Sequence, residues 1–258
     1  MFGALMRFFR DRVGLSQEAL GLKIGFSKSQ VAMVERGERP PKGNFVPRAD
    51  KVLAAQGALV AAASKLPVSH LASWFTAFAK EESRASSRHE YETHVVPGLL
   101  QTEDYARTVL SHTYPPVDDE EVEGRVAARL ERQRLFSRKP VPDIGFVLEL
   151  SALTRPIGGH QVRRKQLHHI LEIAQLRHVQ MQVMSPNRKT HAGLDGPFVL
   201  LETKQRRQLA YIEGQGGSFF ISEQPDLGNL FGKYGILRAQ ALSPEASVKL
   251  IEQAAEEP

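Results

Sequence analysis

Residues 16–41, SQEALGLKIGFSKSQVAMVERGERPP, decide the fold of the first part of this chain. Ser16 and Ser27 each stand where a helix would begin, because a serine hydroxyl can accept a hydrogen bond from a free N–H group of the first turn. Gly25 and Gly37 stand where those helices would end, because glycine adopts a left-handed conformation without a Cβ clash. The pattern predicts two short helices that are joined by a tight turn and therefore cross.

The spacing of apolar residues predicts which faces of the two helices meet. Leu20 lies four residues before Ile24, and Val31 lies three before Val34. Residues at these spacings share one helix face, so we expect the four side chains to form a common core. The opposite face of the second helix would carry Lys28, Ser29, Ala32 and Met33. This is the arrangement in which a recognition helix enters the major groove of DNA.

Positive charge is concentrated at the N-terminal end of the chain. The 258 residues carry a net charge of +5. Residues 1–66 contain 11 Lys and Arg residues against 5 Asp and Glu residues, whereas the remainder contains 23 against 24. A polyanion would therefore bind the first quarter of the chain, through neutralised phosphates and released counterions.

Residues 1–66 are predicted to form an all-α domain of five helices. An opening helix would carry an apolar stripe of Phe2, Leu5, Phe9 and Val13, with Arg7 and Arg10 on another face. After the crossing pair, helices over 44–56 and 58–65 would complete the bundle, with Gly57 as the break between them.

Composition sets further limits. The chain has no cysteine, which excludes disulfides, thiolate zinc sites and cysteine nucleophiles and is compatible with a reducing cytosol. No run approaches the roughly 18 apolar residues of a membrane span, and arginines come too early for a signal peptide. We expect a cytoplasmic, nucleoid-associated protein.

The first domain resembles the Cro/repressor-like helix-turn-helix of the xenobiotic-response-element (XRE) regulators. The match lies in Leu15-Ser16-Gln17-Glu18, Leu20, Ile24-Gly25, Ser27, Val31, Val34-Glu35-Arg36-Gly37 and Pro40. By position, the resemblance implies DNA contacts from Gln17, Ser27, Lys28, Ser29, Gln30, Met33, Arg36 and Arg39. Gln17, Gln30 and the two arginines would lie at phosphates, and the other exposed residues of the third helix at base edges. The family pattern also implies a structural pair between Arg10 and Glu35.

Three positions refine this expectation. Lys28 could donate a hydrogen bond to guanine, and Met33 could pack on a thymine methyl group. Because Met33 is apolar where the family commonly has a polar or basic residue, we expect modest selectivity from each half-site. Gly21 stands where the family usually has alanine, which keeps the helix crossing free but costs about 1 kcal/mol of helix propensity.

Residues 67–258 are predicted to form a connector and an α+β domain with a mixed sheet. A helix over 69–83 would place Trp74, Phe75 and Phe78 in a core. An extended run from Tyr91 would be followed by a Pro-Gly turn, a helix capped by Thr102 and a polar helix from Asp118. Strands are expected at 143–150, 179–184, 198–202 and 209–213, and helices at 161–176 and 243–253.

This second part resembles the domain of unknown function that follows an XRE-type helix-turn-helix in many actinomycete regulators. The resemblance lies in Val96-Pro97-Gly98-Leu99-Leu100-Gln101-Thr102-Glu103-Asp104-Tyr105-Ala106, in Arg129-Leu130-Glu131-Arg132-Gln133, in Ile157-Gly158-Gly159, in Gln166-Leu167 and in Gly196-Pro197-Phe198. Members are often encoded beside a small acidic protein and are described as antitoxin-like or developmental regulators. The resemblance thus implies a sensor or a docking surface.

The histidines do not form a pattern that is typical of a catalytic or metal site. His168 and Glu172 are four residues apart and could share a metal, with His169 and His178 nearby, but no third ligand has diagnostic spacing. His191 and Asp195, with Ser185, could be read as a hydrolase set, but a Gly-x-Ser-x-Gly elbow is absent. We expect no catalysis, no metal and no cofactor.

The sequence predicts a homodimeric, sequence-specific transcription regulator that reads an inverted repeat in double-stranded DNA. Its second domain would supply the dimer contacts and receive a small acidic protein or a small-molecule effector. The alternative is an antitoxin-like module that sequesters a small acidic partner, with DNA binding as autoregulation. In that case its surface would include Tyr91, His94, Tyr105 and the face over 125–138.

Overall fold

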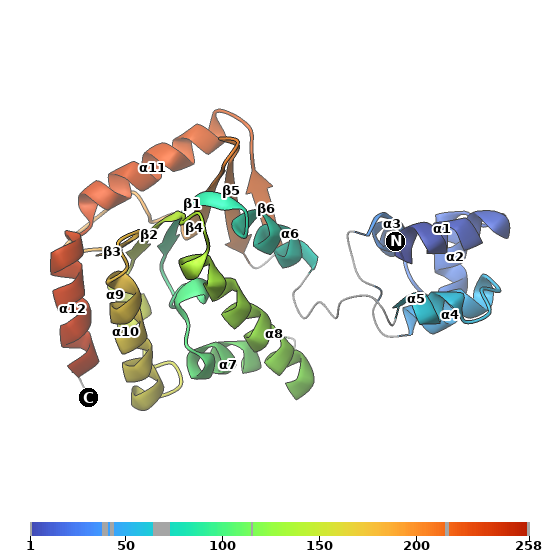
Figure 1. The fold of residues 1–258 in the computed structure, drawn as a ribbon, viewed down its shortest axis with the longest axis horizontal. Coiled ribbons are helices and arrows are strands. Elements are labelled where there is room, and N and C mark those ends of the chain that lie inside the picture. Colours follow the sequence, from blue (N-terminus) through green and yellow to red (C-terminus); the bar gives the residue numbers. More distant parts are fainter. Residues whose placement is uncertain are drawn as a thin grey trace. The chain divides into compact units, whose positions relative to one another are not determined.

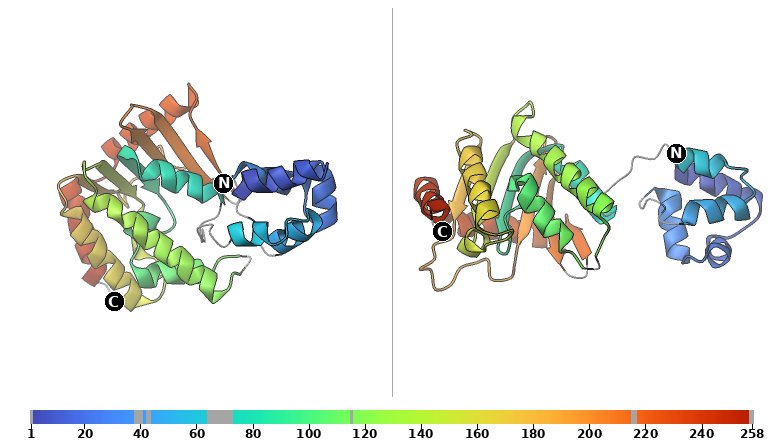
Figure 2. Two further views of the ribbon diagram at one scale, coloured as in Figure 1. Left: turned by 45° about the vertical axis from the view of Figure 1, so that its right-hand side comes forward. Right: turned by 90° about the horizontal axis from the view of Figure 1, so that it is seen from below.

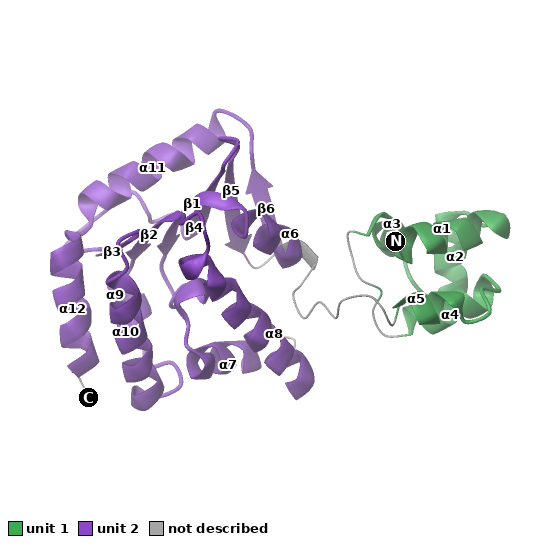
Figure 3. Ribbon diagram, in the orientation of Figure 1, with its two compact units in different colours: residues 1–73 green, residues 74–258 purple. Residues whose placement is uncertain are grey.

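The computed structural model describes residues 2–37, 41, 44–63, 73–114, 116–214 and 217–256 (Figure 1). The chain divides into two compact units, residues 1–73 and 74–258 (Figure 3). The domain boundary predicted between residues 66 and 67 lies outside the described residues. The predicted fold class is confirmed, because a helical unit is followed by an α+β unit with a mixed sheet.

The described part of the first unit is a bundle of α1 Phe2–Arg12, α2 Gln17–Ile24, α3 Lys28–Arg36, α4 Phe45–Val52 and α5 Ala58–Ala63. The predicted caps are confirmed: the Ser16 hydroxyl accepts from the Ala19 N–H at 3.0 Å, and the Ser27 hydroxyl from the Gln30 N–H at 3.2 Å. Gly25 and Gly37 end α2 and α3 with φ angles of 79° and 74°.

The predicted core of the crossing pair is also confirmed, since Leu20, Ile24, Val31 and Val34 are all buried in one cluster. Ala32, however, is buried rather than exposed. The inner face of α3 is wider than the apolar spacing suggested, because Glu35 also lies on it and pairs with α1.

Two further expectations for this unit were wrong. Helix α1 packs Phe2, Leu5 and Phe9 against the core as predicted, but it ends at Arg12, so Val13 is exposed, and Arg10 is buried instead of lying on another face. The helix predicted over 44–56 ends at Val52. The chain turns there because the Asp50 carboxylate accepts from the backbone N–H groups that open α5, those of Gly57 at 2.8 Å and Leu59 at 2.9 Å.

The second unit, which starts within α6 Ser73–Glu82, is built on one six-stranded sheet (Figure 2). The strands are β1 Ala85–Glu92, β2 Asp143–Leu148, β3 Val179–Val183, β4 Phe198–Thr203, β5 Gln208–Gly214 and β6 Gly217–Ile221. They lie in the order β3-β2-β1-β4-β5-β6. The pairs among β1, β2 and β3 are parallel, and those from β1 through β4 and β5 to β6 are antiparallel.

Helices cover both faces of this sheet. The remaining elements are η1 Gly98–Leu100, α7 Glu103–Ser111, α8 Asp119–Arg132, η2 Gln133–Ser137, α9 Leu150–Thr154, α10 His160–Ala174, α11 Asp226–Gln240 and α12 Pro244–Glu256. Phe146 and Val147, neighbours on β2, point to opposite faces. Phe146 lies in a core with α10 and α12, and Val147 in a core with α11.

Several boundaries differ from those predicted. The strand expected over 143–150 ends at Leu148, and α9 follows it. The extended run expected from Tyr91 already begins at Ala85. Helix α11 and strand β6 were not predicted from the sequence. Tyr91 and Tyr105, proposed as part of a partner surface, are each 1% exposed and belong to the core.

Candidate nucleic-acid interface

The first turn of α3 is fixed by a reciprocal capping box. The Ser27 hydroxyl accepts from the Gln30 backbone, and the Gln30 side chain accepts from the Ser27 N–H at 2.9 Å. Both side chains therefore order the start of the helix, which leaves its leading turn rigid. Lys28 and Ser29 follow directly and are exposed.

The predicted DNA-contacting residues gather on one segment. Gln17 opens α2, Ser27 caps α3, and Lys28, Ser29, Gln30, Met33 and Arg36 lie on α3. Met33 is half-buried and Arg36 exposed. Arg39 lies outside the described residues. No contact with DNA is tested by this structure, so the assigned roles remain predictions.

Behind this segment, Glu35 connects three elements. Its carboxylate accepts from Arg10 at 2.5 Å (Nε to Oε1) and 3.0 Å (Nη2 to Oε2), as the family pattern implied. Gln17 adds a third hydrogen bond from Nε2 at 2.8 Å. The hydrogen bond to Glu35 raises the pKa of Arg10 further. Arg10 is thus a structural residue whose positive charge is balanced by Glu35. Gln17, in contrast, stays half-exposed at the start of α2.

The crossing of α2 leaves no room for a side chain at Gly21. A Cβ atom built there would lie 2.5 Å from the backbone oxygen of Phe26. The turn between α2 and α3 therefore requires glycine at this position. The sequence had suggested only that the residue must be small.

Residues 96–106, the first motif of the second resemblance, form a hydrogen-bonded segment that we call the joint. Tyr105 Oη accepts from the Val96 N–H at 3.1 Å, and Gln101 Nε2 donates to the Val96 oxygen at 2.7 Å. Arg129 of α8 donates to Gln101 Oε1 at 2.6 Å, and Gln166 of α10 donates to the Leu100 oxygen at 2.6 Å. Residues 96–106, which follow β1 in the chain, are thus hydrogen-bonded to both α8 and α10.

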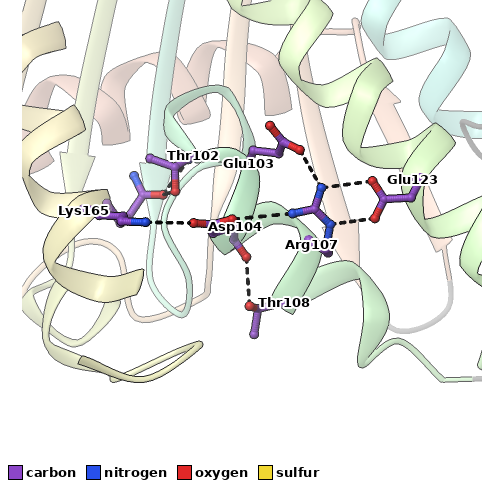
Figure 4. Close-up of polar contacts among 8 residues, drawn as sticks. Thr102, Glu103, Asp104, Arg107, Thr108, Glu123 and Lys165 are labelled. Atoms are coloured by element: carbon purple, nitrogen blue, oxygen red, sulfur yellow. Dashed lines mark hydrogen bonds and ion pairs between the residues drawn. The ribbon is translucent and has the colours of Figure 1, made fainter. Parts of the chain in front are cut away.

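Charged side chains extend this joint to the surface (Figure 4). Arg107 of α7 bonds Glu123 of α8 at 2.6 Å (Nε to Oε1), and Lys165 of α10 lies 3.3 Å from Asp104. Thr102 occupies the predicted cap position, but its hydroxyl makes no cap hydrogen bond and instead faces Gln166 Oε1 at 3.4 Å. The predicted cap position is thus confirmed, but the expected side-chain hydrogen bond is absent, and the Thr102 hydroxyl donates to α10 instead.

The histidine groups considered for chemistry are dispersed. His191 Nε2 lies 3.3 Å from Glu149, whose carboxylate also accepts from Tyr91 at 2.7 Å. Asp195 pairs with Lys233 at 2.6 Å instead of with His191. Within the described ranges, no three His, Cys, Asp or Glu side chains are grouped so that they could hold a metal ion.

Taken together, the capped crossing pair and its exposed leading turn define a helix-turn-helix DNA-binding unit. Residues 1–63 match the family model described as Helix-turn-helix domain. Residues 75–253, more than half of the chain, match the model described as Domain of unknown function (DUF5753), and the chain belongs to that family. No curated protein matches the chain, and no solved structure does. No helix among the described residues is long and apolar enough to cross a membrane.

Proposed function

We propose that this protein is an XRE-type transcription regulator that reads a specific DNA sequence with α3. The observation that carries the proposal is the exposed turn of Lys28 and Ser29 at the capped start of α3, held from behind by the buried Glu35. This turn leads the recognition helix into the major groove in helix-turn-helix proteins. Lys28 would contact guanine and Met33 a thymine methyl group.

We also propose that the second unit brings two copies together on an inverted repeat. Strand β6 is the last strand of the sheet, so one of its edges faces no other strand among the described residues. Phe219 and Phe220 on it are 56% and 37% exposed. Antiparallel pairing of β6 with its counterpart would cover this edge, and a strand that pairs with its own copy satisfies two-fold symmetry.

Sedimentation and footprinting test the dimer. Phe219→Glu should shift the protein toward monomer and shorten the protected DNA from two half-sites to one, because a charge would be buried at the pairing edge. Tyr114→Glu, at a side chain that is 94% exposed, is the matched control and should leave both unchanged. A Phe219→Glu protein that remains dimeric would exclude β6 as the contact.

The second unit would receive a small acidic protein or a small-molecule effector. The alternative function is antitoxin-like: this unit would sequester a small acidic partner, and DNA binding would serve autoregulation. The division of the chain supports this alternative, since residues 74–258 form a compact unit of their own that does not include the helix-turn-helix. Lys28→Ala separates the two: a variant defective in DNA binding should lose control of its target genes if regulation is the primary role, but should still neutralise the partner in cells if sequestration is.

No catalysis, metal or cofactor is part of the proposal. Action on the chromosome would place the protein in the cytoplasm, at the nucleoid. Binding sites mapped across the genome in living cells would test the action on the chromosome, and the absence of enriched sites would contradict a regulatory role.

A further inference from the structure

A basic pocket lies in the second unit, far along the sequence from the helix-turn-helix. Its volume is about 450 Å³. Three separate segments form its walls: the turn between α6 and β1, the segment after η2, and the turn between β4 and β5. The lining residues are Ser83, Arg84, Arg138, Lys139, Pro140, Lys204 and Gln205.

The charges in this pocket are of one sign. Four of its lining residues are cationic, and none is acidic. Arg84, Lys139 and Lys204 are exposed, and within the described ranges none of the four cations forms an ion pair. Arg206, in the same β4–β5 turn as Lys204, differs from these four cations because it pairs with Glu202 at 2.7 Å. In the described part of the chain, the four pocket cations thus have no carboxylate within ion-pair distance.

Arg138 gives the pocket a fixed cation. Its Nη1 donates to the Ser83 oxygen at 2.6 Å, and its Nη2 donates to the Ala85 oxygen. Its Nε is buried and has no hydrogen-bond partner among the residues that the structure describes. Burial lowers the pKa of Arg138, and no carboxylate offsets that effect. A guanidinium held by two backbone carbonyls is oriented before any ligand arrives, which reduces the entropy lost on binding.

We propose that this pocket binds a phosphoryl group. A phosphate is a compact anion with several acceptor oxygens, and arginine and lysine are its usual protein ligands. The volume exceeds that of a single phosphate and accommodates a phosphorylated small molecule. The phosphoryl group could belong to such a molecule or to the backbone of DNA. The site goes beyond the proposed reading of DNA by α3, because none of its residues belongs to the first unit.

Titration of the full chain with inorganic phosphate and with pyrophosphate tests the site. Backbone amide NMR signals of Arg84 and Lys204 should shift and saturate. Lys139→Gln combined with Lys204→Gln should weaken binding by about tenfold or more, because charged hydrogen bonds are lost. Lys189→Gln combined with Lys249→Gln removes the same charge at exposed positions outside the pocket and should change the affinity less than about twofold.

The salt dependence of DNA binding identifies the source of the phosphoryl group. If the pocket holds DNA, the first double variant should reduce the slope of log affinity against log salt by about 2, since each lost phosphate contact removes about 0.9. If it holds a free molecule, that slope should match the control double variant while phosphate binding is lost. Lys28→Ala should leave phosphate binding intact, so failure of DNA reading and failure of this site are separable.

Two results would overturn the proposal. One is the absence of saturable shifts with either anion together with equal salt slopes for the two double variants. The other is equal loss of phosphate binding in both double variants, since the effect would then reflect net charge alone.

Discussion

Arg10 and Glu35, 25 residues apart in the sequence, form a buried ion pair that joins α1 to the recognition helix α3. Their side chains are 9% and 2% exposed. The geometry is bidentate; Gln17 also donates to Glu35, and Arg10 also donates to the Leu15 backbone oxygen and to Asp11. The orientation of α3 therefore depends on a residue in the first helix of the unit.

Arg10→Ala should destabilise the first unit by about 3–5 kcal/mol, because it leaves a buried carboxylate without its partner. Hydrogen exchange of the α3 amides in the full chain measures this loss. Arg7→Ala is the control, since Arg7 faces Asp11 at 3.6 Å with both side chains largely exposed. It should cost less than about 1 kcal/mol. Equal protection of α3 in the two variants would contradict a structural role for the pair.

Gly21→Ala should also destabilise the first unit, although alanine gains about 1 kcal/mol of helix propensity over glycine. The added Cβ would lie 2.5 Å from the Phe26 oxygen, so the turn between α2 and α3 must move. Gly235→Ala in α11 is the matched control, because a Cβ there meets nothing within 4 Å. That change should raise stability by about 0.4–1 kcal/mol. Thermal melts of both variants show whether each substitution raises or lowers the stability. Stabilisation by both would contradict the close approach of α2 to the turn at Phe26.

Glu82 should make the second unit sensitive to acid. Burial alone would raise its pKa, but Arg132 and Arg88 overcome that effect and lower it to about 2. The carboxylate lies 2.8 Å from Arg88 and 2.7 Å from Arg132. Because the folded pKa lies below the ordinary 4.5, this stabilisation is present above about pH 4.5 and is lost as the pH falls toward 2. Hydrogen exchange of β1 amides across that range measures the loss.

Glu82→Gln separates this group from the other carboxylates. The variant should be less stable at pH 7 by about 3–5 kcal/mol, since the buried Arg88 and the partly buried Arg132 lose a charged partner. It should also lose less further stability than the wild type between pH 4.5 and 2. Glu131→Gln, at an exposed pair with Arg134, should behave as the wild type. Identical acid profiles for the Glu82 and Glu131 variants would exclude Glu82 as the source.

Local signals in the sequence predicted the first unit well. Caps at Ser16 and Ser27 and the left-handed glycines act within a few residues, so their outcome does not depend on distant packing. Where tertiary contacts decide, prediction failed. Asp50 ends α4 early by accepting from amides of the next helix, and Thr102, although it stands at the N-cap of α7, makes no side-chain cap bond and donates to Gln166.

The second unit shows the same limit on a larger scale. The order of strands in the sheet follows from pairings such as that of β1 with β4, more than 100 residues apart, which no local pattern specifies. The basic pocket is a further example: the sequence beyond residue 66 has almost balanced charge, yet folding brings Arg84, Arg138 and Lys204 together.

The central claim, that α3 reads DNA with its exposed face, is tested most directly by the affinity of Lys28→Ala combined with Met33→Ala for a selected operator. Specific affinity should fall by about tenfold to a hundredfold while binding to unrelated DNA changes little, because each base contact contributes about 1–3 kcal/mol. Lys51→Ala combined with Val60→Ala removes one lysine and one apolar side chain elsewhere in the same unit and should bind as the wild type. An unchanged footprint and affinity for the folded α3 variant would contradict the claim.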